Sequence, residues 1–64
     1  MDIITQKLIK SESYTKAEIE AFGCEYIKET TITMYYRKEN YLYIFNAKPD
    51  KNCKYKLLTI DIDN

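Results

Sequence analysis

The fold is decided by the stretch from Thr30 to Asn46, which reads TTITMYYRKENYLYIFN. Two runs of β-branched and aromatic residues alternate with period two on either side of the polar residues 38–40. This alternation predicts two β-strands joined by a turn, because successive side chains of a strand point to opposite faces. In the second run the aromatic residues share one face and the aliphatic residues share the other. One of these faces must be core, and the other is a candidate binding surface.

The length of the turn decides which side chains share a face. A three-residue loop at 38–40 places Asn40 in the left-handed conformation, which Asn tolerates, and sets Arg37 opposite Tyr41. The core face then consists of Ile32, Met34, Tyr36, Leu42 and Ile44. A loop of two or four residues reverses the parity, so that the aromatic residues of the second run join the first strand's apolar face. We expect the three-residue loop because it gathers the aliphatic side chains.

This choice of loop predicts an open sheet face that is rich in tyrosine. Surfaces with several tyrosines beside an arginine are typical of protein contacts. The simpler interpretation is that both faces are half covered and that the tyrosine hydroxyls reach water. The predicted partner-binding site consists of Tyr35, Arg37, Tyr41, Tyr43 and Phe45.

A short helix is predicted from Lys16 to Phe22. Thr15 and Glu18 have the spacing of a capping box, in which each side chain bonds to the backbone N–H of the other residue. Gly23 stands where a left-handed glycine commonly ends a helix. A two-turn helix is not stable alone, so we expect its apolar stripe to dock on the sheet.

The remaining segments complete an α+β pattern. Residues 1–10 fit a strand or a helix, and the β-branched residues at their start favour a strand. Residues 25–28 either begin a strand or bridge into the next one. Residues 54–62 predict a strand whose apolar parity changes between Leu57 and Leu58, which indicates a bulge or burial on both faces.

We therefore predict one small α+β domain over residues 1–64. It consists of a three-stranded antiparallel meander, with a fourth N-terminal strand as an option, packed on one short helix in the order (β)αβββ. A chain of 64 residues buries only about 60% of its unfolded surface, so its stability is expected to be marginal.

Composition and charge disfavour several classes of protein, including duplex-DNA binders, membrane-spanning proteins and secreted proteins. The net charge is zero, which disfavours a protein that tracks duplex phosphates. The charge is uneven along the chain: residues 12–29 hold five Glu and two Lys, and residues 37–56 hold six Lys or Arg and two acids. No apolar run is long enough to span a membrane, and the N-terminus lacks the pattern of a secretory signal. We expect a cytoplasmic protein.

The residues that usually carry enzyme chemistry are missing from the sequence. It contains no histidine, no glycine-rich loop and no acidic cluster with metal-ligand spacing, so neither an enzyme, a metal site nor a cofactor is expected. Cys24 and Cys53 are expected to be reduced and part-buried. Cys24 follows the carbonyl end of the predicted helix, where the helix dipole raises the pKa of a thiol.

Two functions remain open on these observations. The first is a non-enzymatic module that binds another protein, or itself as a homodimer, through the tyrosine-rich face. The Lys-, Ile-, Tyr- and Asn-rich composition is typical of AT-rich genomes, where lone domains of this size are often phage or plasmid inhibitors or adaptors of larger machines. The less favoured alternative is a single-stranded nucleic-acid binder or small regulator that uses Arg37, Lys38, Lys54 and Lys56.

Overall fold

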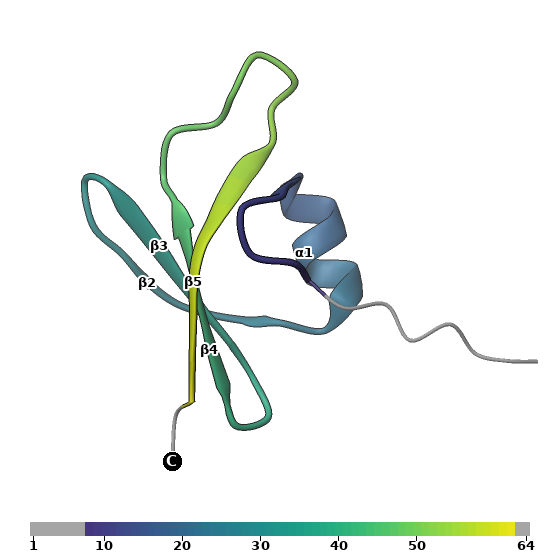
Figure 1. The fold of residues 1–64 in the computed structure, drawn as a ribbon, viewed down its shortest axis with the longest axis vertical. Helices are drawn as coiled ribbons and strands as arrows, with labels where there is room; N and C mark the ends of the chain where they lie inside the picture. The colour runs from purple at the N-terminus through teal and green to yellow at the C-terminus, as the bar shows by residue number, and fades with distance from the viewer. Residues whose placement is uncertain (1–7, 63–64) are drawn as a thin grey trace, which may run out of the picture.

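The computed structural model describes residues 8–62, which form one short helix and a five-stranded antiparallel sheet (Figure 1). The elements in chain order are β1 (Ser13–Tyr14), α1 (Lys16–Phe22), β2 (Glu25–Glu29), β3 (Thr33–Lys38), β4 (Tyr41–Asn46) and β5 (Tyr55–Ile62). The strands lie in the order β1-β5-β4-β3-β2, and each neighbouring pair is antiparallel. The predicted α+β class, with a meander on one short helix, is confirmed.

The helix begins and ends where its capping residues predict. The Thr15 backbone N–H donates to the Glu18 carboxylate at 2.9 Å, and the Glu18 N–H donates to the Thr15 hydroxyl at 3.1 Å. Gly23 adopts a left-handed conformation with φ of +102°, and its N–H closes the last turn on the Glu20 carbonyl at 2.9 Å. The predicted bounds, Lys16–Phe22, are therefore confirmed.

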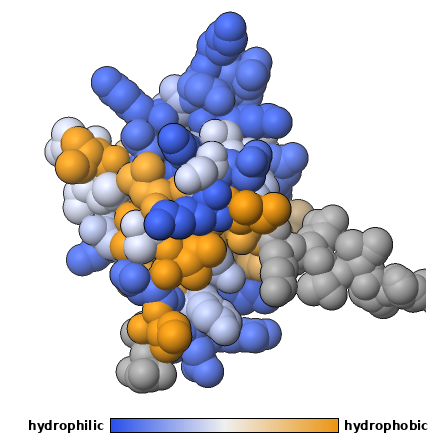
Figure 2. Space-filling view, in the orientation of Figure 1, coloured by the Kyte–Doolittle hydropathy of each residue, from blue (hydrophilic) through white to orange (hydrophobic). Residues whose placement is uncertain are grey.

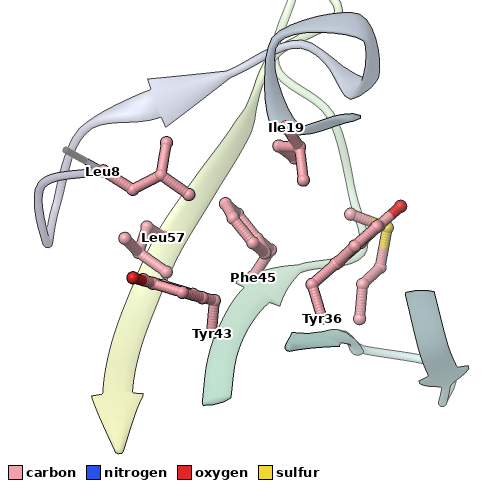
Figure 3. Close-up of a cluster of buried hydrophobic side chains, with 7 residues drawn as sticks. Leu8, Ile19, Tyr36, Tyr43, Phe45 and Leu57 are labelled. Atoms are coloured by element: carbon pink, nitrogen blue, oxygen red, sulfur yellow. The ribbon is translucent and has the colours of Figure 1, made fainter. Parts of the chain in front are cut away.

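The core lies between one face of the sheet and the segments that cover it. Ile19 of α1 and Leu8 point down onto the central strands (Figure 3). Phe45 is completely buried in the middle, and the Tyr36 ring meets it edge to face at 5.6 Å. The buried side chains are Leu8, Ile19, Met34, Tyr36, Tyr43, Phe45 and Leu57. Apolar burial of this kind is the main stabilising contribution in a domain of this size.

The β3–β4 hairpin has a two-residue loop, so the expected three-residue loop is wrong. Lys38 pairs with Tyr41, which leaves only Glu39 and Asn40 in the turn. Glu39, and not Asn40, takes the positive φ, at +57°. A positive φ at the first loop position is the requirement of a type II′ turn, a common two-residue hairpin connection. The alternative parity is thus the one that the chain adopts.

The aromatic residues explain this register. Tyr36 lies opposite Tyr43 and Met34 opposite Phe45, so large side chains of both strands meet beneath the helix. An aromatic side chain buries about 150–250 Å², more than an aliphatic one, and edge-to-face ring contacts stabilise the pair further. Grouping the rings under α1 therefore outweighs the grouping of aliphatic residues that the three-residue loop offers. Leu42 and Ile44 consequently turn to the opposite face.

The sheet has two edge strands, β1 and β2, in addition to the predicted three-stranded meander. Residues 25–29 form a full edge strand, β2, with an irregularity at Ile27. The N-terminal strand is Ser13–Tyr14, which pairs with the start of β5. Residues 8–10 are not in a strand, and residues 1–7 of the predicted strand lie outside the described residues. In β5 the register shifts at Leu58, which confirms the predicted bulge.

Candidate functional site

Within residues 8–62, α1 and the segment at Leu8 pack on one face of the sheet only, and we call the opposite face the open face. Its central members are Tyr35 and Arg37 of β3, Leu42 and Ile44 of β4, and Thr59 and Asp61 of β5. They alternate along each strand with the residues that point into the core. Neither α1 nor the segment at Leu8 packs on the open face, which makes it the candidate surface for contact with another molecule.

Cross-strand pairing arranges these six residues in two rows. One row runs Arg37–Leu42–Asp61, and the next runs Tyr35–Ile44–Thr59. Residues directly opposite each other in a sheet have Cβ atoms about 4.5–5.5 Å apart, so the residues of each row are neighbours on the open face. The middle of the open face is thus apolar, with Leu42 and Ile44 half-buried. In the first row Leu42 lies between Asp61 and Arg37, and Arg37 is paired in turn with Glu25 of β2.

Tyr35 shares its surroundings with a lysine of the neighbouring edge strand. The Lys28 ammonium lies 4.9 Å from the centre of the Tyr35 ring, within the range of a cation–π contact. Lys28 and Tyr35 are cross-strand partners on the open face. One side of this ring is therefore occupied within the protein, and Tyr35 is the only member of the predicted aromatic set whose ring lies on the open face.

A groove of about 400 Å³ lies at one end of the open face. It is lined by Thr31, Ile32 and Thr33 of the β2–β3 hairpin, Asn46 and Lys48 at the end of β4, and Leu58 of β5. Ile32 is 71% exposed at the tip of its hairpin, whereas Leu58 is half-buried. The groove thus joins exposed apolar side chains, two threonine hydroxyls, an amide and one ammonium.

The loop between β4 and β5 forms the end of the molecule beside this groove, and hydrophilic side chains cover it at the top of Figure 2. The Asp50 carboxylate organises the loop by accepting the backbone N–H of Asn52 at 2.8 Å and of Lys54 at 3.0 Å. These two hydrogen bonds hold the pKa of Asp50 below its ordinary value. The carboxylate of Asp50 is therefore hydrogen-bonded to the backbone of the loop that contains it.

The structure separates the five predicted partner-binding residues onto two faces. Tyr35 and Arg37 lie on the open face. Tyr41, Tyr43 and Phe45 lie on the side of the helix, because the two-residue loop reverses their parity. Tyr43 and Phe45 are core residues with 7% and 0% exposure, so neither is accessible to a partner. Tyr41 is exposed, beside Tyr43 and at the far end from the groove.

The four cations predicted for nucleic-acid binding also fail to form one patch. Arg37 and Lys38 stand next to the β3–β4 turn, whereas Lys54 and Lys56 stand at the opposite end of the strands, near the β4–β5 loop. Four residues of strand separate the two pairs, which corresponds to roughly 13 Å along the sheet. Arg37 and Lys56 belong to strand positions of the open face, Lys38 points to the helix side, and Lys54 precedes β5.

Lys38 joins the sheet to the end of the helix. Its ammonium donates to the Phe22 carbonyl at 2.8 Å and lies 4.0 Å from the centre of the Phe22 ring. The carbonyls at a helix C-terminus lack partners within the helix and carry a partial negative charge, which a lysine neutralises. The Lys38 side chain passes 3.6 Å from where a Cβ on Gly23 would stand, which is an ordinary van der Waals contact, so the positive φ and not a lack of space favours glycine at this position. Lys38 thus holds α1 onto the sheet.

Three titratable side chains near this contact have raised pKa values. Burial raises the pKa of the Cys24 thiol to about 11, although the neighbouring Lys38 charge opposes this shift. Burial also raises the pKa values of Tyr36 and Tyr43. A nucleophilic thiol needs a lowered pKa, so Cys24 has the character of a packing residue. Cys53 is exposed in the β4–β5 loop, contrary to the expected partial burial, and both thiols are free.

Several members of the open face were absent from the predicted site. They are Leu42, Ile44, Leu58, Ile32 and Lys48. The signal for the first two was present in the sequence, since the alternative two-residue loop puts them on the face of Tyr35. No sequence signal identifies the groove, because it forms where the β2–β3 turn, the end of β4 and the β5 bulge meet in space.

No family model, curated protein or solved structure matches this chain. Among residues 8–62, no three His, Cys, Asp or Glu side chains come together in an arrangement that could hold a metal ion. The same part of the chain has no helix long and apolar enough to cross a membrane.

Proposed function

We propose that this chain is a small non-enzymatic module that binds another protein through the open face of its sheet. Its partner is a larger macromolecular machine that it inhibits or to which it acts as an adaptor, as phage- and plasmid-encoded domains of this size do. We also propose that the protein acts in the cytoplasm. Alternatively, the open face binds a second copy of the same chain and forms a homodimer.

The observation that carries the proposal is the contiguous apolar centre of the open face. Tyr35, Leu42, Ile44 and Leu58 lie on three adjacent strands, and none of them takes part in the buried core. Polar or charged side chains surround this centre on the outer strands. An apolar centre within a polar rim, with tyrosine and arginine present, is the usual anatomy of a protein interface.

Nucleic-acid binding is the second candidate, and the open face favours it less. Single-strand binders stack bases on several exposed aromatic rings along a basic groove. Here Tyr43 and Phe45 are buried, and Lys28 lies over the ring of Tyr35. The cations that remain near the face are divided between its two ends.

Site-specific photo-crosslinking tests the proposed function. A benzoylphenylalanine at position 42 lies in the middle of the open face, and the same group at Ala17 lies on the exposed surface of α1 as a matched control. We expect a discrete crosslinked protein, or a crosslinked dimer, from position 42 alone, and we expect Ile44→Lys to abolish it. Equal products from both positions, or products that survive Ile44→Lys, contradict a specific interface.

Light scattering in low and high salt separates the two candidate functions. A monomer or dimer whose mass ignores a short single-stranded oligonucleotide agrees with a protein partner. If the mass increases only with the oligonucleotide and the increase disappears in high salt, the protein binds nucleic acid, because contacts to phosphates weaken steeply with salt.

A further inference from the structure

We propose that the groove at the β4–β5 end of the open face receives a short segment of the partner that combines apolar side chains with carboxylates. This inference rests on the proposed function, since it names the chemistry that the partner presents to the same surface. It is carried by three features of the groove: its apolar lining, its preformed walls and the positive charge beside it.

The lining of the groove fits aliphatic side chains. Ile32 and Leu58 supply its apolar surface, and the exposed Ile32 would bury most of its side chain against an occupant. The groove volume of about 400 Å³ lies within the range of sites that hold ligands in proteins. Thr31, Thr33 and Asn46 add hydroxyl and amide groups that can bond to a peptide backbone.

The walls of the groove are held in place before any partner arrives. The Thr30 hydroxyl accepts the Thr33 N–H at 3.0 Å, and the Thr30 N–H donates to the Thr33 carbonyl at 2.7 Å, which closes the β2–β3 turn. The Ala47 N–H donates to the Ile32 carbonyl at 3.0 Å and ties this turn to the end of β4. Ile32 is thus displayed on a fixed turn, and a preformed site loses little conformational entropy on binding.

The charge beside the groove is positive. Lys48 lines the groove itself, and its backbone N–H donates to the Asn46 side chain at 2.8 Å, which fixes the start of the loop. Lys51 and Lys54 belong to the same loop as Lys48, and Lys56 lies at the start of β5. The one acid of residues 48–56 is Asp50, whose carboxylate accepts two backbone N–H groups, so this segment carries four lysines against one aspartate. A carboxylate on a partner therefore meets an excess of ammonium groups, which favours its approach and its orientation.

The same features argue for a peptide and against a nucleic acid at this position. Among residues 8–62, no aromatic ring lines the groove, so the described lining offers a base nothing to stack on. The apolar side chains Ile32 and Leu58 gain nothing from contact with phosphates, but they gain free energy when they are covered by an aliphatic side chain. An acidic segment with aliphatic residues satisfies both the lining and the charge.

The test is a two-dimensional amide NMR titration of the full chain with a blocked hexapeptide. The peptide contains two leucines flanked on each side by an aspartate and a glutamate, and a control peptide replaces its four carboxylates by amides. We expect the acidic peptide to shift the amide resonances of Ile32, Asn46, Lys48 and Leu58 at millimolar concentration, and we expect high salt to weaken this binding. The control peptide is expected to bind at least about fivefold more weakly.

Matched variants separate the contributions of charge and apolar contact. Lys48→Glu is expected to weaken binding at least about fivefold, whereas Lys16→Glu makes the same charge change on the helix and is expected to have no effect. Ile32→Ser is expected to weaken binding about tenfold. Ile62→Ser is its control, because Ile62 is 69% exposed at the other end of the sheet, as Ile32 is 71% exposed here. All four side chains are exposed, so each variant is expected to fold.

The outcomes distinguish this inference from the proposed function. Equal binding of both peptides, shifts that lie outside the groove, or no shifts at millimolar peptide overturn the acidic-segment proposal. Stronger binding of a short oligodeoxythymidylate at the same residues overturns it in favour of a nucleic acid. If the peptide fails but crosslinking from position 42 still requires Ile44, the open face remains the interface and only the partner's chemistry is wrong. If the crosslinking fails as well, the proposed function fails with it.

Discussion

The contact between Lys38 and the end of α1 makes a quantitative prediction about stability. Lys38→Met removes the ammonium but keeps a flexible apolar stem that still packs on the Phe22 ring. The variant loses the 2.8 Å hydrogen bond to the Phe22 carbonyl and the cation–π contact at 4.0 Å. Because α1 has only seven residues, its attachment to the sheet depends on few interactions of this kind.

The magnitude follows from the three effects of this one ammonium. A hydrogen bond to a charged group contributes about 1.5–3 kcal/mol, a cation–π contact about 0.5–1 kcal/mol, and a cation at a helix C-terminus about 0.3–1 kcal/mol. These effects overlap, and Lys38 is only half-buried, so solvent screening reduces their sum. We expect Lys38→Met to lower the free energy of unfolding by about 1–2 kcal/mol. In a domain of this size each kcal/mol corresponds to about 4–8 °C in Tm.

Urea and thermal unfolding followed by circular dichroism measure this change. Lys51→Met is the matched control, because Lys51 is exposed in the β4–β5 loop and its substitution is expected to change stability by less than about 0.5 kcal/mol. A double-mutant cycle with Phe22→Leu isolates the cation–π contribution, since the Phe22 carbonyl remains available for the hydrogen bond. Equal midpoints for Lys38→Met and Lys51→Met would refute the assigned role of Lys38.

Three further predictions concern the loops and the thiols. Glu39→Gly is expected to raise the free energy of unfolding by about 0.5–1 kcal/mol, because glycine adopts the φ of +57° without strain; an unchanged urea midpoint contradicts the type II′ assignment. The pKa of Asp50 in the folded state is expected below 3.8, so the stabilising contribution of its carboxylate is complete above the unfolded pKa and is lost as the pH falls through the folded pKa. The Asp50→Asn variant is expected to lack this loss of stability during acid unfolding. A folded-state pKa at or above 3.8, measured by NMR titration of the carboxyl group, contradicts this prediction. Cys53 is expected to react with a thiol reagent at pH 8 much faster than Cys24, whose pKa is raised to about 11; equal rates in the folded protein would show that Cys24 is not shielded.

The sequence by itself determined the local structure of this protein. The helix from Lys16 to Phe22 was predictable because Thr15, Glu18 and Gly23 act within a few residues of each end. The strands before and after the 39–40 turn were predictable because period-two alternation is a local pattern. The bulge in β5 was predictable because the apolar parity changes at Leu58. Each of these features depends on neighbours in the chain.

Only the tertiary structure decided which face of the sheet is buried. Both faces of β4 are apolar in sequence, with Tyr43 and Phe45 on one and Leu42 and Ile44 on the other. A loop one residue shorter exchanges them, and the local pattern barely distinguishes the two registers. Long-range packing decides between the two registers, because the aromatic rings of β3 and β4 bury more surface beneath α1 than the aliphatic residues would.

The hairpin register also determined where individual side chains lie. Lys38 was a candidate for nucleic-acid binding in sequence and became a cap on α1, because the observed register turns it to the helix side. The groove beside Lys48 exists only because the β2–β3 turn, the end of β4 and the bulge of β5 meet there. Local propensity determined the elements of this protein, whereas the packing of residues distant in sequence determined its core, its open face and its candidate binding site.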